Sequence, residues 1–166
     1  WQTTLSPVMG FHYDIKARQA FDAGQIDQGF SQNDRALGWQ PEVPLIRTIK
    51  AIQLGYAAQG KANVQNRATL LKAAGTEMEV ALEYDSLNRS SWSRYAEYSR
   101  EIIRSENNQA SVLRALHIAN ILVELMPGQW QALGSLGWTQ VLASQPQLAI
   151  ETLEEAEIVA YREKHN

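Results

Sequence analysis

Apolar positions along the chain recur every three to four residues, the spacing of one face of an α-helix, and the apolar–polar alternation of β-strands is lacking. Turn-forming residues divide this pattern: Gly24 follows the first periodic stretch, Pro41 and Pro44 bracket the second break, and Pro127 and Pro146 mark two later ones. Because the breaks are short, consecutive helices should form antiparallel hairpins. The pattern predicts eight helices, over residues 10–23, 26–39, 43–59, 63–84, 90–105, 108–126, 129–143 and 146–163.

Small residues recur in the last predicted helix pair at positions where a helix more commonly has large side chains. They are Gly134, Gly137, Ala149 and Ala156. The tetratricopeptide repeat (TPR) is a 34-residue helix–turn–helix with the pattern W-x2-L-G-x2-Y, then A-x3-F, then Pro. With Trp130 as the first residue of a repeat, Gly137, Ala149 and Ala156 fall at positions 8, 20 and 27. A larger side chain there would push neighbouring helices apart.

The same register fits other parts of the chain. Small residues and prolines take the expected positions in a first unit (Ala17, Gly29, Ala36 and Pro41) and a third unit (Ala115 and Pro127), whereas the second unit has only Ala81-Leu82 near its end. The sequence therefore resembles TPR proteins. This resemblance implies an all-α fold of about eight helices, in which antiparallel helix hairpins stack as a degenerate TPR-like right-handed solenoid. Residues 1–9 are predicted to be a stub or linker and residues 10–166 the repeat domain; a generic helical bundle is the alternative.

Composition adds mainly exclusions. The chain has no cysteine, which excludes disulfides, thiolate nucleophiles and cysteine-based metal sites. Its net charge is −3, and its 15 Lys and Arg residues are interspersed with 18 Asp and Glu, so we expect no nucleic-acid partner. No window approaches eighteen uninterrupted apolar residues, so we expect no membrane span in this segment.

Few residues suggest reactive chemistry. His12, His117 and His165 have no second ligand at metal-binding spacing, so we expect no metal and no cofactor, and His117 should be a structural residue on a packed helix. The stretch from Gly55 to Lys61 matches part of a phosphate-binding loop. Ala62 follows where that loop needs Ser or Thr, and the preceding residues read as a helix, so a helix ending at Gly60 is expected instead. Catalysis is therefore not predicted for this domain.

What remains is surface. In TPR-like solenoids the first helix of each hairpin lines a concave face that binds extended partners. Trp92, Tyr95 and Tyr98 are spaced along one helix face and should belong to the core first and to a ligand platform second. For Trp138, packing between hairpins is favoured over ligand contact. Transferring the inward-facing positions of the family predicts binding by Asp14, Arg18, Asp22, Ser93, Glu97, Arg100, Gln131 and Trp138, with a protein or peptide as partner.

The N-terminal stretch WQTTLSPVMGFHYDIKARQAFDAGQIDQGFSQNDRALGWQP combines a short polar stub, an A-x2-A-F-x-A-G unit and an A-L-x3-P close. It resembles the tail that follows the last membrane helix in bacterial O-antigen ligase/polymerase-like proteins ending in TPRs. The resemblance implies a non-catalytic interaction domain on the extracytoplasmic, periplasmic face of a membrane protein that assembles cell-envelope polysaccharide. Two alternatives stay open: a free cytoplasmic TPR scaffold or repeat segment of a transcriptional regulator, and an all-helical enzyme with an unrecognised site.

Overall fold

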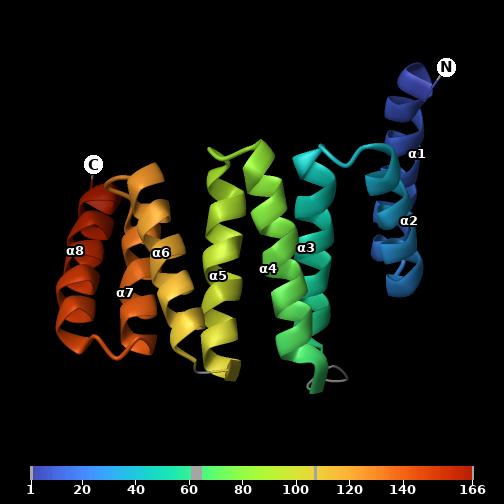
Figure 1. Ribbon diagram of the computed structural model, residues 1–166. Helices are drawn as coiled ribbons and strands as arrows, with labels where there is room; N and C mark the ends of the chain where they lie inside the picture. The colour runs from blue at the N-terminus through green and yellow to red at the C-terminus, as the bar shows by residue number, and fades with distance from the viewer. Residues whose placement is uncertain (1, 61–64, 107, 166) are drawn as a thin grey trace.

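The computed structural model describes residues 2–60, 65–106 and 108–165, with side chains from residue 6 onward. These residues form eight α-helices and no strand, as the apolar periodicity predicts. The helices pair into four antiparallel hairpins that stand side by side in chain order (Figure 1). The hairpins combine α1 (Gln2–Asp22) with α2 (Ile26–Trp39), α3 (Pro44–Gln59) with α4 (Arg67–Tyr84), α5 (Arg89–Glu106) with α6 (Gln109–Leu125), and α7 (Trp130–Leu142) with α8 (Pro146–His165).

Small residues lie where the two helices of a hairpin come closest, as the repeat register predicts. In the last hairpin a Cβ atom added to Gly137 would lie 2.6 Å from Cγ of Leu153 on α8. In the first hairpin Gly29 packs against the ring of Phe21 in the same way. Gly134 is an exception, because a Cβ atom there would meet nothing within 4 Å. A close approach by another described side chain therefore does not explain the glycine at position 134.

One continuous hydrophobic core runs through α3 to α7. Met78 of α4 is fully buried in it, beside Tyr95 and Tyr98 of α5, each only 4% exposed. Trp92 packs partly buried against the same core, so the prediction that these aromatic residues belong to the core is confirmed. A Cβ atom at Gly55 would lie 2.6 Å from the Tyr98 ring, so α3 and α5 also meet at a glycine, in the unit where the repeat pattern is weakest.

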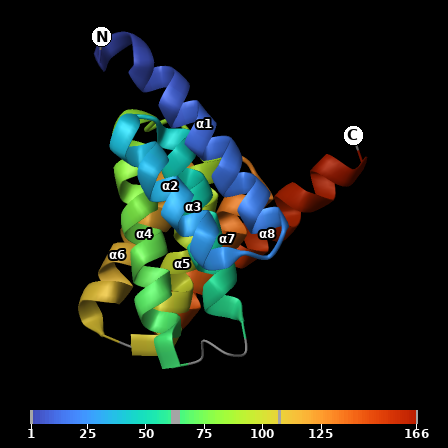
Figure 2. The same ribbon diagram turned by 90° about the vertical axis from the view of Figure 1, so that its right-hand side faces the viewer.

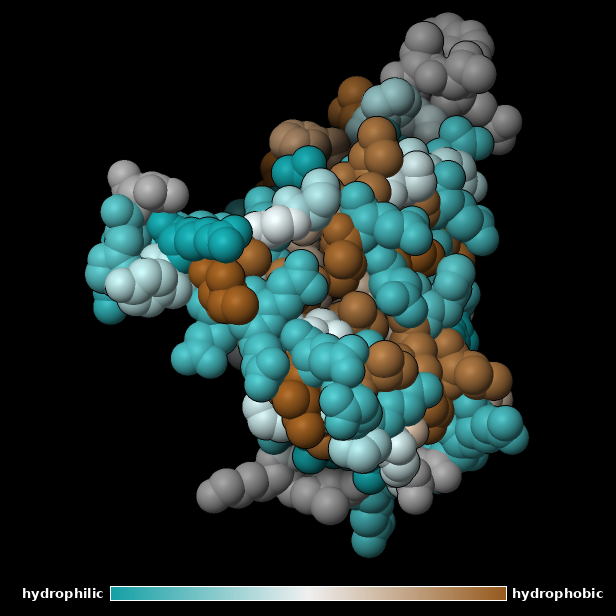
Figure 3. All heavy atoms as spheres, turned by 90° about the vertical axis from the view of Figure 1, so that its left-hand side faces the viewer, coloured by the Kyte–Doolittle hydropathy of each residue, from teal (hydrophilic) through white to brown (hydrophobic). Residues whose placement is uncertain are grey.

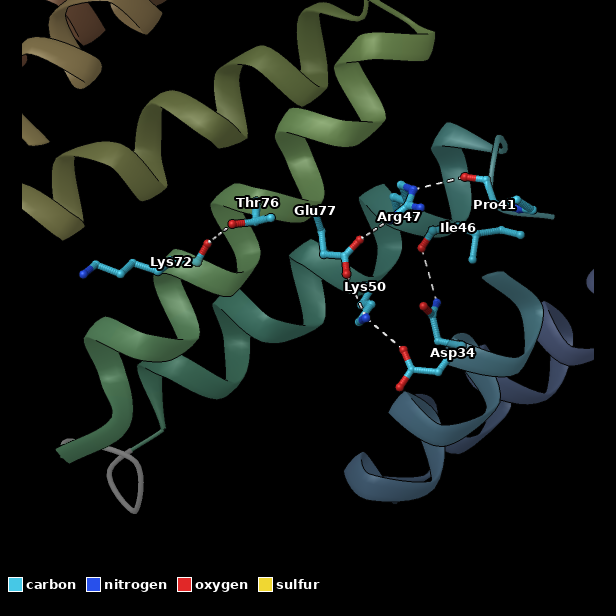
Figure 4. A network of polar contacts seen from close by, with 9 residues as sticks. Asp34, Pro41, Ile46, Arg47, Lys50, Lys72, Thr76 and Glu77 are labelled. Carbon is cyan, nitrogen blue, oxygen red and sulfur yellow. Dashed lines mark hydrogen bonds and ion pairs between the residues drawn. The ribbon is translucent and has the colours of Figure 1, made fainter. Parts of the chain in front are cut away.

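Polar contacts join the first hairpin to α3 and α4 (Figure 4), and Phe30 of α2 packs against the hydrophobic core. The buried amide of Asn33 donates to the carbonyl oxygen of Ile46 at 3.3 Å. Lys50 Nζ lies 2.8 Å from a carboxylate oxygen of Asp34 on α2 and 2.8 Å from one of Glu77 on α4. Glu77 also pairs with Arg47 at 2.9 Å. Glu77 of α4 therefore forms ion pairs with both Arg47 and Lys50 of α3, next to the first hairpin.

The first helix begins earlier than predicted. Residues 2–9, expected as a stub or linker, are helical, because α1 starts at Gln2 and continues through Pro7. The reason is tertiary packing: the Ser6 hydroxyl donates to the carbonyl oxygen of Trp39, and Gly10 packs against the side chain of Gln40. The end of α2 thus supports this turn of α1. The N-terminal end of α1 and the C-terminal end of α8 both project beyond the other helices (Figure 2).

The break after α3 agrees with the predicted helix end, since α3 stops at Gln59 and Gly60 caps it in an extended conformation. Lys61 and Ala62, the rest of the phosphate-loop-like stretch, lie outside the described residues, as do residues 63 and 64 of the predicted fourth helix. No helix in the described part of the chain has both the length and the apolar character needed to cross a membrane.

Candidate functional site

The predicted residues of the third unit share one face of α5. Ser93, Glu97 and Arg100 follow each other at intervals of four and three residues, which places them on one side of a helix. Ser93 is exposed, and Glu97 and Arg100 are half-buried. The other side of α5 carries Tyr95 and Ser99, which are buried in the fold. The helix therefore separates a core face from a polar, accessible face.

Arg100 connects this face of α5 to α7. Its Nη1 donates to the hydroxyl of Ser135, and its partial burial lowers the pKa of the guanidinium through desolvation. Ser135 shares a side of α7 with Gln131 and Trp138, again at intervals of four and three residues. The predicted residues of the last two units are thus brought together, and we call Ser93, Glu97, Arg100, Gln131, Ser135 and Trp138 the α5–α7 face.

Trp138 is the most distinctive member of the α5–α7 face. Its side chain is 56% exposed, so the favoured interpretation that it packs between hairpins is wrong. The reason is that Gly137 and Thr139, its neighbours in sequence, take the buried positions of α7 instead. An exposed tryptophan leaves a large apolar surface in contact with water, which binding of a partner would remove.

The predicted residues of the first unit lie elsewhere. Asp14, Arg18 and Asp22 are on α1 at the end of the stack, with α3 and α4 between them and α5 (Figure 1). Asp14 is only 5% exposed and pairs with Arg18 at 2.7 Å. Its second oxygen, Oδ1, is buried without a hydrogen-bond partner among the described residues. Asp14 thus supports Arg18 from within the hairpin and offers little surface of its own.

The structure also corrects the expectation for His117, which is exposed on α6. The apolar contacts of α6 with the core come from Ile118, Leu122 and Val123, so the side of the helix that bears His117 faces solvent. In the described part of the chain no group of three or more His, Cys, Asp or Glu side chains is arranged to hold a metal ion.

A groove that the sequence did not reveal runs between α4 and α6. Both helices pack on α5, but their backbones hardly approach each other, and the Arg114–Glu79 ion pair bridges the gap between them. The side of α5 opposite the α5–α7 face forms the floor of the groove. Two cavities lie in it, of about 190 and 240 Å³, and both are lined by Tyr95 and Arg114. The available signal was the spacing of polar residues at intervals of three and four on each helix, as in Lys72/Thr76 and Ser111/Arg114.

Apolar side chains also gather at the α8 end of the stack, among hydrophilic ones (Figure 3). The exposed apolar residues of α8 are Leu148, Ile150, Ile158 and Tyr161. A shallow hollow of about 420 Å³ lies at the junction of α7 and α8, with Val141, Ile150 and Leu153 in its lining.

No protein-family model and no curated protein sequence matches the chain. Among solved structures, one of MamA superposes on 99% of this chain and 86% of its own, with a TM-score of 0.70 and 11% identity. The MamA MSR-1 C2 structure covers 87% of this chain and 72% of its own, with a TM-score of 0.66 and 12% identity. The chain has a TPR-like solenoid fold. At such identities the likeness extends to the fold alone.

Proposed function

We propose that this chain is a non-catalytic scaffold domain that binds a protein or peptide partner on the α5–α7 face. The observation that carries the proposal is the exposed Trp138 on the same surface as the half-buried Arg100. Tryptophan and arginine are the residue types that most often dominate binding energy when a partner excludes water from them. The hydrogen bond from Arg100 to Ser135 holds its guanidinium in place before binding, which lowers the entropy cost of association.

The charges around this face suggest how a partner is recognised. Arg94 pairs with Glu97 at 3.0 Å, and Arg104 pairs with Glu101, so cations and anions alternate along α5. A surface of mixed sign does not select a strongly acidic or basic partner. We therefore expect apolar contact with Trp138 to provide most of the affinity, and the ion pairs at the rim to provide specificity.

The test uses capture of partners from the source cells with the tagged 166-residue chain. Trp138→Ala should lose the bound partner or weaken it at least about tenfold, the loss expected when an interface hot spot is truncated. The matched control is Trp130→Ala, which removes a tryptophan from the same helix with 43% exposure, outside the predicted set. If both variants capture the same partners as the wild type, the α5–α7 face is not the binding surface.

We further propose that the domain belongs to a membrane-anchored protein of the O-antigen ligase/polymerase type and lies on its extracytoplasmic side. The support is the resemblance of residues 1–41 to the tails of such proteins. An antibody against this domain, applied to fractionated source cells, should detect a large band that stays in the membrane pellet after washing at high pH. A soluble band close to the 18.6 kDa of this chain would instead favour a free scaffold.

A further inference from the structure

The smaller cavity of the α4–α6 groove lies on the opposite side of α5 from the α5–α7 face, so it is a separate site. It exists because α4 and α6 rest on α5 without closing over it. Its volume is about 190 Å³. An apolar cavity of about 150 Å³ is large enough to hold a benzene molecule, so this one can accept a group the size of a single ring. The lining residues are Lys72, Gly75, Thr76, Tyr95, Ser99, Ile102, Ser111 and Arg114.

The lining has the composition of a site for an anion. It contains two cationic side chains, Lys72 and Arg114, and no carboxylate. The hydroxyls of Thr76 and Ser99 donate to carbonyl oxygens of their own helices, at 3.1 and 2.7 Å. The principal donors left for a ligand are the two cations and the Ser111 hydroxyl. The Ser111 hydroxyl makes only a long contact of 3.5 Å, with Glu106.

Arg114, whose side chain is 52% exposed, is held at the edge of this cavity by Tyr95. Its Nε and Nη2 donate to the Tyr95 hydroxyl at 2.9 and 2.6 Å, and its guanidinium lies 5.6 Å from the centre of the Tyr95 ring. Nη2 also pairs with Glu79. Among the described residues no partner is found for Nη1, so this nitrogen keeps its donors for a ligand. Because Tyr95 is itself almost fully buried, the guanidinium is positioned before any ligand arrives.

The two cations are balanced by carboxylates that do not line the cavity. Lys72, whose side chain is 56% exposed, lies 2.5 Å from Glu106, whose side chain is only 20% exposed. Glu79, the partner of Arg114, is 51% exposed. The Arg114–Glu79 pair is exposed on both sides and contributes little net stability, so an incoming oxyanion can replace or join Glu79 at small cost, whereas at Lys72 it would join Glu106.

We propose that this cavity binds a small organic anion whose carboxylate or phosphate group contacts Lys72 and Arg114, and whose body is about the size of a single ring. The ring would rest against Ile102 and the backbone of Gly75. By contacting Lys72 of α4 and Arg114 of α6, such a ligand would add a second link between two helices that the Arg114–Glu79 pair already joins. The proposal does not depend on a protein partner at the α5–α7 face.

The test is a titration of the isotope-labelled 166-residue chain with benzoate, followed by NMR at constant ionic strength. Saturable shifts are expected for the amides of Gly75, Ser99 and Ser111. Benzyl alcohol, a neutral molecule of similar size, should bind at least about tenfold more weakly, because it has no negative charge to pair with Lys72 and Arg114. Phenyl phosphate, as a second probe, distinguishes the anions: the tighter of the two identifies the preferred group.

Two variants and one control locate the site. Arg114→Gln and Lys72→Gln should each weaken benzoate binding by about tenfold. Arg104→Gln removes an exposed arginine of α5 that does not line the cavity, and it should leave binding unchanged. Lys72 is exposed, so Lys72→Gln still tests the site if Arg114→Gln destabilises the fold. Three outcomes would each overturn the proposal: benzoate and benzyl alcohol bind equally well, all three variants bind benzoate as tightly as the wild type, or sodium chloride reproduces the shifts.

Discussion

Gly134 and Gly137 lie three residues apart on α7, yet a methyl group added at each meets different surroundings. At Gly134 the new Cβ atom has nothing within 4 Å. Alanine there should stabilise the domain by about 0.5–1 kcal/mol, since glycine in a helix interior costs that much relative to alanine. At Gly137 the same atom would lie 2.6 Å from Cγ and 2.7 Å from Cδ2 of Leu153, closer than van der Waals contact allows.

The cost at Gly137 follows from this overlap. Forcing an extra methyl group into a packed site typically costs about 1–3 kcal/mol, and the gain in helix propensity offsets about 0.5–1 of it. Gly137→Ala should therefore lower the free energy of unfolding by about 0–2.5 kcal/mol. For a domain of this size, each kcal/mol corresponds to a change in Tm of about 2–4 °C.

Urea unfolding of the two single variants measures both effects in the same helix with the same substitution. A third variant, Leu153→Ala, removes the side chain that the new methyl group would strike, so in its background Gly137→Ala should no longer destabilise. The double-mutant cycle then isolates the contact between residues 137 and 153. If Gly137→Ala stabilises the domain as much as Gly134→Ala, the close packing of α7 on α8 is wrong.

Three further predictions concern charged and titratable groups. Burial raises the pKa of Tyr98 to about 12, so the folded state holds this proton more tightly than the unfolded state. The stability that this group contributes is fully present below pH 10 and is lost as pH rises from about 10 to 12, by about 1 kcal/mol at pH 11. In Tyr98→Phe, the free energy of unfolding should therefore fall less steeply over this pH range than in the wild type. The same pH dependence in both proteins would refute the prediction. Glu77→Gln should lower the free energy of unfolding in urea by about 1–3 kcal/mol, because it leaves Arg47 and Lys50 side by side without their shared partner. It should also speed amide hydrogen exchange in α1 and α2. Unchanged exchange would mean that other contacts hold the first hairpin in place. Arg18→Glu should lower Tm by placing a second carboxylate beside the buried Asp14, whereas Arg18→Lys should change it little; equal Tm values would show that the pair contributes nothing.

The helical elements could be predicted from the sequence because their boundaries are encoded locally. Gly24 and Gly128 both adopt positive φ angles, of 73°, in the turns where the sequence suggested breaks. The repeat register likewise identified Gly137 correctly, since one hairpin has a stereotyped close approach. It gave no position to Gly134, and spacing alone could not show that the side chain approaching Gly137 is Leu153 on another helix.

The surfaces were harder to predict, for a related reason. Helical spacing placed Ser93, Glu97 and Arg100 on one face of α5, but it could not show that Arg100 reaches Ser135 on α7. The groove between α4 and α6 depends on the distance between these two helices where both pack on α5. The pattern of apolar and polar residues along the sequence does not determine that distance. The early start of α1 also depends on contacts with the end of α2 that lie more than thirty residues away.

The most direct test of the scaffold proposal is site-specific photocrosslinking in the source cells. A photoreactive amino acid is placed in turn at Ser93 on α5, at Gln131 on α7 and at Glu124, an exposed position on α6 away from the α5–α7 face. Binding at that face predicts that positions 93 and 131 crosslink to the same partner and that position 124 does not. Crosslinks from position 124 alone, or no partner shared by positions 93 and 131, would contradict it.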